Sequence, residues 1–312
     1  MERSWLTAAR VVLVAGKGGV GSSTVAAAMA LAAARRGADV LLVAVDGKPG
    51  LGPLLGGHPL SAVEQLLRTV AGPGRIRGRT IPPEQAFRDY LDLKGLGSVV
   101  RKAASAVSLD SIAASTPGLQ HLLVMGKVKE LERTKAADLI IVDTPPAGHA
   151  GPFIRSARSM QEVIEGGPIR QQADEVASML ADPKRAQAVL VTLPEETPVN
   201  EVIELAADVS GEIGVHLAAL VVNACWPDRA GLHLSTTAAA RESGIKLPAA
   251  VRSALVASSR FGASRLGLQR EQIERLLDAV HAPHLVVPRL PTPRLHPHHL
   301  DTIADAVSRE PA

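Results

Sequence analysis

The sequence predicts an α/β fold in which a mainly parallel sheet is flanked by helices. Short apolar runs, each the length of one buried strand, recur along the chain and alternate with stretches of helical periodicity. A strand, a helix and a second strand in close succession imply a parallel pair joined by a right-handed crossover. Polar residues follow several of these runs, and the carboxyl ends of parallel strands face the ligand crevice of such sheets. We therefore expect a functional site where these strands end.

The composition fits one domain of this class. The chain has 312 residues, of which 46% are hydrophobic and only 2% aromatic, so alanine, valine and leucine must fill the core. The net charge of +3 comes from 34 basic and 31 acidic residues, a balance that predicts no nucleic-acid partner. The single cysteine, Cys225, excludes an intrachain disulfide and a zinc site built from paired cysteines. No signal peptide and no apolar run of about 18–20 residues is visible, so we expect a cytoplasmic protein.

Residues 11–24 carry the strongest motif. The apolar run Val11–Ala15 predicts a strand, Gly16 ends it, and a helix is expected to begin near Ser22. A strand, a glycine-rich turn and a helix N-terminus form the P-loop arrangement of NTPases, in which backbone N–H groups and the helix dipole hold phosphate. The predicted nucleotide contacts in this stretch are Gly16, Lys17, Gly18, Gly19, Val20, Gly21, Ser22, Ser23 and Thr24.

One position departs from the P-loop pattern G-x-x-x-x-G-K-[ST]. Gly16 and Gly21 fit it, and Ser23 fits the hydroxyl that binds Mg²⁺, but Ser22 stands where the pattern has lysine. A second lysine, Lys17, follows the first glycine. This K-G-G-V-G arrangement resembles the deviant P-loop of the dimeric ATPases that include the arsenite-pump ATPase, the tail-anchored-protein targeting factor, and the septum-site and partition ATPases. The resemblance implies that Lys17 is the signature lysine, a catalytic residue that reaches across the dimer to the partner's nucleotide.

The second apolar run, residues 40–45, ends at Asp46. The resemblance implies that Asp46 is the catalytic carboxylate of switch I, which positions or activates the attacking water. The loop that begins here reads D-G-K-P-G, whereas the family usually has D-P-A-H.

A third apolar run ends at Asp143, which reads as a Walker B carboxylate that holds Mg²⁺ through water. The alternative is an aspartate that caps the next turn. The run D-T-P-P-A-G-H resembles switch II of the arsenite-pump and tail-anchored-targeting branch, where the glycine hinges on the γ-phosphate and the histidine helps transmit the change. The expected switch II residues are Asp143, Thr144, Pro145, Pro146, Ala147, Gly148 and His149.

Three later strands complete the predicted sheet. Glu195 and Glu196 follow the strand at 188–193 and are either a helix cap or close to the nucleotide. Asn223 ends the next strand, and the resemblance implies that it hydrogen-bonds the adenine edge. Pro288, at the end of the last strand, is counted among the nucleotide contacts.

The domain is expected to span residues 1–312, with a helical subdomain inserted into the nucleotide-binding core. Helical periodicity predicts that the subdomain is formed by insertions at about 84–135, 150–182 and 227–266. The alternating arginines of residues 75–79 fit a solvated strand face better than a phosphate-binding patch. The three histidines of residues 296–299 fit a solvated loop better than a metal site.

The closest likeness is to actinobacterial members of the arsenite-pump and tail-anchored-targeting group, which occur as paralogous pairs. It implies an ATP-binding subunit that uses Mg²⁺ and switches conformation within a dimer. Because Ser22 replaces the P-loop lysine, we favour a heterodimer with a paralogue over a homodimer. The alternatives are a hydrolysis-deficient regulatory pseudo-ATPase or a partition or septum-site ATPase. One cysteine cannot form the cluster that arsenite extrusion needs, whereas a membrane-protein client remains open as a further partner.

Overall fold

The computed structural model describes residues 4–312 except 46–47, 94, 96–117, 146 and 233. Its centre is an eight-stranded sheet in the order β3-β4-β2-β5-β1-β6-β7-β8. All neighbouring strands pair in parallel except β3 and β4, which are antiparallel. The strands are β1 (Val11–Gly16), β2 (Asp39–Ala44), β3 (Gln65–Thr69), β4 (Arg75–Thr80), β5 (Leu139–Asp143), β6 (Ala186–Thr192), β7 (Leu217–Cys225) and β8 (His284–Pro288). The predicted α/β fold with a mainly parallel sheet is therefore confirmed.

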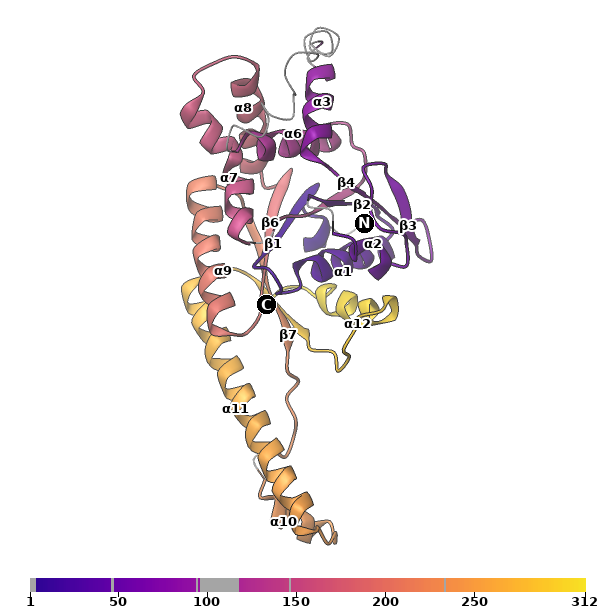
Figure 1. The fold of residues 1–312 in the computed structure, drawn as a ribbon, viewed down its shortest axis with the longest axis vertical. Coiled ribbons are helices and arrows are strands. Elements are labelled where there is room, and N and C mark those ends of the chain that lie inside the picture. The colour runs from indigo at the N-terminus through magenta and orange to yellow at the C-terminus, as the bar shows by residue number, and fades with distance from the viewer. Residues whose placement is uncertain (1–3, 46–47, 94, 96–117, 146, 233) are drawn as a thin grey trace.

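Helices cover both faces of this sheet (Figure 1). The helices are α1 (Ser22–Arg35), α2 (Leu51–Leu54), α3 (Pro83–Leu93), α6 (Leu119–Arg133), α7 (Ala147–Val163), α8 (Pro168–Ala181), α9 (Glu196–Asp208), α10 (Thr236–Glu242), α11 (Ala249–Ala279) and α12 (Pro297–Val307). Two single turns, a 3-10 helix at Trp5–Thr7 and a π-helix at Val209–Ile213, complete the elements. Among the described helices, none is both long and apolar enough to cross a bilayer.

Strand β1 lies at the centre of the core because all six of its residues are buried. Val11 and Leu13 pack in the layer that contains α6 to α9, whereas Val12 and Val14 pack against α1 and α12 on the opposite face. Helix α1 is buried continuously from Val25 to Ala34, and most of these residues are alanines. Their small side chains let the sheet and α12 approach the helix closely. This packing holds the N-terminus of α1 rigidly at the end of β1.

Helices α3, α6, α7 and α8 pack against one another beside the sheet (Figure 1). They come from two of the expected insertions, 84–135 and 150–182. Helices α10 and α11, which cover most of the third, lie at the other end of the molecule. Helix α11 has 31 residues, of which Leu266, Gln272 and Leu276 are buried. It joins the core at α9, where Arg265 binds Glu195 at 3.0 Å. The division into a core and one helical subdomain stays a prediction.

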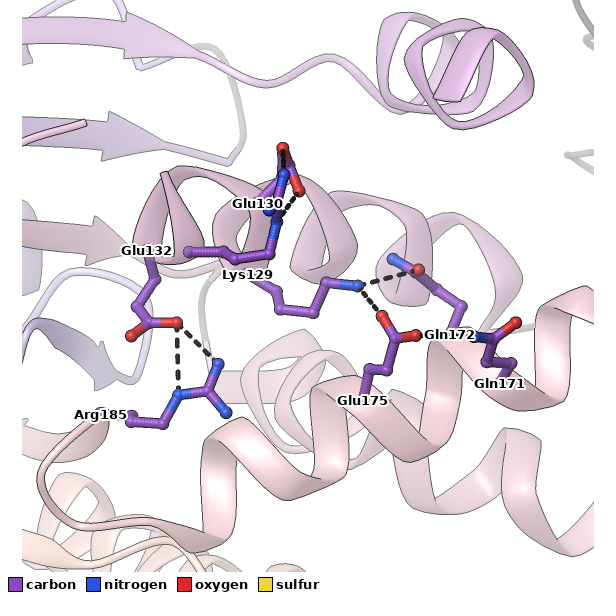
Figure 2. A network of polar contacts seen from close by, with 8 residues as sticks. Lys129, Glu130, Glu132, Gln171, Gln172, Glu175 and Arg185 are labelled. Carbon is purple, nitrogen blue, oxygen red and sulfur yellow. Dashed lines mark hydrogen bonds and ion pairs between the residues drawn. The ribbon is translucent and has the colours of Figure 1, made fainter. Parts of the chain in front are cut away.

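Two buried charged residues on α6 connect this helix to α8 and to the sheet (Figure 2). Lys129, only 6% exposed, donates to the side-chain Oε1 of Gln172 at 3.2 Å and pairs with Glu175, both on α8. Glu132, 4% exposed, accepts a hydrogen bond of 2.6 Å from Arg185, just before β6. That hydrogen bond raises the pKa of the Arg185 guanidinium. A buried charge is tolerated when a partner of opposite sign compensates for its lost hydration, so these pairs fix how α6 sits against α8 and the sheet.

The alternating arginines lie on β4 and are used within the sheet. Arg75 and Arg77 bind the carboxylate of Asp39 on the neighbouring strand β2, at 2.7 and 3.0 Å. Burial alone would raise the pKa of Asp39, but the hydrogen bonds from these two arginines outweigh it and lower that pKa. The interpretation of this stretch as a strand face therefore fits the structure.

The histidines at the start of α12 cap that helix. The His296 backbone N–H donates to His299 Nδ1 at 3.1 Å, and the rings of His298 and His299 lie 3.9 Å apart. Within the described part of the chain, no group of three or more His, Cys, Asp or Glu residues is arranged to hold a metal ion.

We predict that Arg185→Leu destabilises the fold by about 2 kcal/mol, because it leaves Glu132 buried beside only the more distant Arg10. The estimate is below the ~3–5 kcal/mol of a fully buried pair because Arg185 is 32% exposed. Urea unfolding followed by circular dichroism measures the change. The neighbouring exposed residue provides the control, Lys184→Leu, and equal stabilities of the two variants would contradict the prediction.

Candidate functional site

The glycine-rich loop between β1 and α1 is shaped to receive an anion. Gly19 and Gly21 adopt the left-handed conformation, with φ of 90° and 87°. Gly21 is the N-cap of α1 and no side chain donates or accepts a capping hydrogen bond there. The first N–H groups of an α-helix have no partner inside the helix, and the positive end of the helix dipole lies with them. An anion placed at this loop would satisfy both.

Two of the glycines are also required by space. A Cβ on Gly16 would lie 2.5 Å from the Val191 carbonyl oxygen of β6. A Cβ on Gly21 would lie 2.4 Å from Nδ2 of Asn223. At Gly16 the neighbour is backbone, so only glycine fits, whereas at Gly21 the neighbour is the end of a side chain and the positive φ is the stronger reason for glycine.

Asn223 on β7 fastens the loop from the side. Its Nδ2 donates to the Val20 carbonyl at 2.8 Å. The family resemblance implies an adenine contact for this residue, and that role stays a prediction beside the observed one. Pro288 ends β8 opposite Cys225 of β7. Burial raises the pKa of the Cys225 thiol to about 12, so this cysteine is not a thiolate near neutral pH.

Asp143 ends β5 directly beside the loop. It is in register with Val14 of β1, and the Thr144 N–H and hydroxyl both donate to the Val14 carbonyl, at 3.1 and 3.0 Å. The Asp143 side chain is fully buried, and Lys48 Nζ lies 2.8 Å from its Oδ1. Lys48 also donates to the Thr144 carbonyl at 2.9 Å. Reasoning from sequence missed Lys48, although the unusual D-G-K-P-G loop was a signal for it.

Lys17 is held by its own chain. Its ammonium group forms an ion pair with Glu201 of α9, and the two side chains are 36% and 33% exposed. Sequence reasoning did not identify Glu201, because no local pattern indicates that a residue 184 positions further along the chain reaches the loop.

A cavity of about 660 Å³ opens at this edge of the sheet. The residues that line it include Ser23, Thr24 and Lys48 and, from the segment before α12, Arg294 and His296. Its size is typical of a small-ligand site. The glycine cradle suits phosphate, and Ser23 and Asp143 offer the hard oxygen ligands that Mg²⁺ prefers. The residues present thus fit a magnesium nucleotide.

The remaining predicted site residues are Asp46 and those of the switch II loop. Asp46 and Pro146 lie outside the described residues, as do the side chains of Ala147 and His149. Pro145 is buried, and Gly148 is exposed in the first turn of α7, where an added Cβ would meet nothing within 4 Å. The switch II roles therefore stay predictions.

Comparison with known proteins agrees with this geometry. A family model described as "Anion-transporting ATPase" matches residues 9–59, which span β1, α1 and β2. The chain is 33% identical over 306 residues to the ATPase BagA of Mycobacterium tuberculosis, covering 91% of this chain and 88% of the relative. It is 24% identical to a putative arsenical pump-driving ATPase of Halobacterium salinarum, over 71% of this chain and 36% of that protein. It is 26% identical to an arsenical pump-driving ATPase of Escherichia coli, over 68% and 34%.

We predict that Gly21→Ala weakens ATP binding at least tenfold and lowers stability by about 1–2 kcal/mol, because alanine is strained at this positive φ and would push Asn223 away. Isothermal titration with ATP and thermal unfolding measure the two effects. Gly166→Ala is the matched control, since its Cβ would meet nothing within 4 Å. ATP affinity equal to that of the unmodified chain would contradict this reading of the loop.

Proposed function

The chain belongs to the anion-transporting ATPase family, which includes the arsenite-pump ATPases, and we propose that it is an ATP-binding subunit that changes conformation with ATP binding and hydrolysis. The family resemblance seen in the sequence is confirmed by the 33% identity over 91% of the chain. The observation that carries the proposal is the uncapped N-terminus of α1 beside the buried Asp143.

The proposed roles follow from the position of each group. The backbone N–H groups of residues 18–24 would hold the phosphates, and the Ser23 hydroxyl and the Asp143 carboxylate would hold Mg²⁺ directly or through water. When bound, the metal ion neutralises charge that develops on the phosphate oxygens. Asp46 would position or activate the attacking water.

We further propose a heterodimer with a paralogue that carries an intact P-loop lysine. Ser22 removes the cation that this site would use, whereas Lys17, which serves a neighbouring site in the resembled ATPases, is retained. The ion pair of Lys17 with Glu201 is one-third exposed, and such pairs contribute only about 0.2–1 kcal/mol. Lys17 could therefore leave Glu201 at little cost. A homodimer in which Lys17 replaces the missing lysine of the other copy is the alternative.

Ser22 also favours a second candidate function, a regulatory subunit that binds ATP without hydrolysing it. Arsenite transport is not proposed, although relatives are named arsenical pump-driving ATPases. The one cysteine of the chain is buried, and its raised pKa keeps it protonated.

We predict saturable ATP binding that Mg²⁺ strengthens. We expect Asp143→Asn to reduce the gain in ATP affinity caused by Mg²⁺ at least tenfold, because a charged ligand contributes about 1.5–3 kcal/mol. Titration of labelled ATP with and without Mg²⁺ measures it. Asp278→Asn, at an exposed carboxylate on α11, is the control. The absence of saturable binding at millimolar ATP, with or without a partner subunit, would refute the proposed function.

We predict that the isolated chain turns over ATP slowly and that mixing with the paralogue raises the rate. Lys17→Ala should then lower the rate of the pair by about 10²-fold, because a lost transition-state cation acts on the chemical step. The ATP affinity of this chain should stay the same. Steady-state phosphate release is the measurement, with Lys184→Ala as control. Full activity of the isolated chain, or a pair indifferent to Lys17, would argue against the heterodimer.

A further inference from the structure

The site lacks a cation at one place and has an unexpected one nearby. Position 22, the lysine of an ordinary P-loop, is serine. Lys48, which no motif assigns, has its ammonium group at the adjacent strand end. We propose that Lys48 supplies the phosphate-binding cation that position 22 lacks. The inference rests on the proposed ATP site and goes beyond it by naming the residue that replaces the P-loop lysine.

The sheet register brings Lys48 to this place. Ala44 at the end of β2 pairs with Asp143 at the end of β5, and the Val45 N–H donates to the Asp143 carbonyl at 3.2 Å. Val45 therefore lies at the end of β5. Lys48 follows within a few residues, and its Nζ reaches both Asp143 Oδ1 and the Thr144 carbonyl, at 2.8 and 2.9 Å.

The surroundings of Lys48 suit a group that changes partner. Its side chain is 22% exposed and lines the same cavity as Ser23 and Thr24, whereas Asp143 is fully buried. A buried carboxylate needs a neighbouring positive charge, and Lys48 provides it in the chain without nucleotide. A Mg²⁺ ion at Asp143 would replace that charge and repel the ammonium group. The long lysine stem lets Nζ turn from Asp143 into the cavity, toward the phosphates.

Two other cations lie near the loop, and one of them already has a carboxylate partner. Lys17 is paired with Glu201 of α9. Arg294 lines the cavity from the segment before α12 and is the other candidate for the role. An opposite role for Lys48 is also testable: a lysine that only blocks the metal site would weaken nucleotide binding, so its removal would tighten binding. The two roles predict changes of opposite sign.

The test is isothermal titration with ATP and Mg²⁺ on the full chain carrying Lys48→Met, Ser22→Lys, or both. We expect Lys48→Met to weaken ATP binding about ten- to a hundredfold, the loss of one charge-assisted contact. Ser22→Lys in that background should restore the affinity to within about threefold, and Ser22→Lys alone should change it by less than about threefold, because two neighbouring groups that fill one role are not additive. Lys127→Met is the matched control, since Lys127 is 23% exposed and pairs with Asp89 at 2.5 Å.

Several results would overturn the inference. Unchanged or tighter binding by Lys48→Met would do so, as would a loss that Ser22→Lys fails to repair. A loss in Arg294→Met with none in Lys48→Met would assign the role to Arg294. If Lys48→Met does not fold, Ser22→Lys alone still tests the inference, because this variant keeps the Lys48–Asp143 pair. A gain in ATP affinity of tenfold or more would then mean that Lys48 does not supply the phosphate-binding cation, and the inference would be wrong. Failure of the unmodified chain to bind ATP would instead refute the proposed function.

Discussion

The parallel pairing of β1 with β5 and of β5 with β2 is the constraint on which the site depends. It sets Asp143 beside Val14 and Ala44, so β2 and β5 end at one level, and β1 continues beyond that level to Gly16. The Thr144 N–H and hydroxyl, which both donate to Val14, fix this level further. A slip of one residue would turn every side chain of a strand to the opposite face of the sheet, and the contacts of the loop with its neighbours would be lost. The glycine-rich loop, the buried carboxylate and Lys48 therefore meet only because the register is held.

The molecule contains two kinds of buried ion pair. Glu132 and Arg185 lie between the helical layer and the sheet, and their partners are fixed by packing on both sides. Asp143 and Lys48 differ because Lys48 also lines a cavity of about 660 Å³. Breaking the first pair leaves a charge buried in the protein, whereas the second can exchange its cation for one that enters the cavity. The first pair holds the fold together, and the second is placed where ligand binding can act on it.

The lysines near the loop are all neutralised by the chain itself. Lys17 binds Glu201 and Lys48 binds Asp143, while position 22 carries no charge. A triphosphate arriving at the loop would first meet backbone N–H groups and the α1 dipole, which need no rearrangement. The lysines would engage only by leaving carboxylate partners. The backbone would thus make the first contacts with the nucleotide, and the lysines would add theirs after exchanging partners.

The sequence by itself determined the fold class, the family and the loop at residues 16–24, because strand length, glycine spacing and helix onset are properties of neighbouring residues. It also marked the strand end at Asp143 and placed Asn223 near the end of a strand, which in the structure runs on to Cys225. Only the tertiary structure decided what those ends touch: Asn223 holds the Val20 carbonyl, and Lys48 covers Asp143. It also placed α11 away from the other inserted helices. These contacts join residues distant along the chain through sheet register and side-chain direction, which no local pattern encodes.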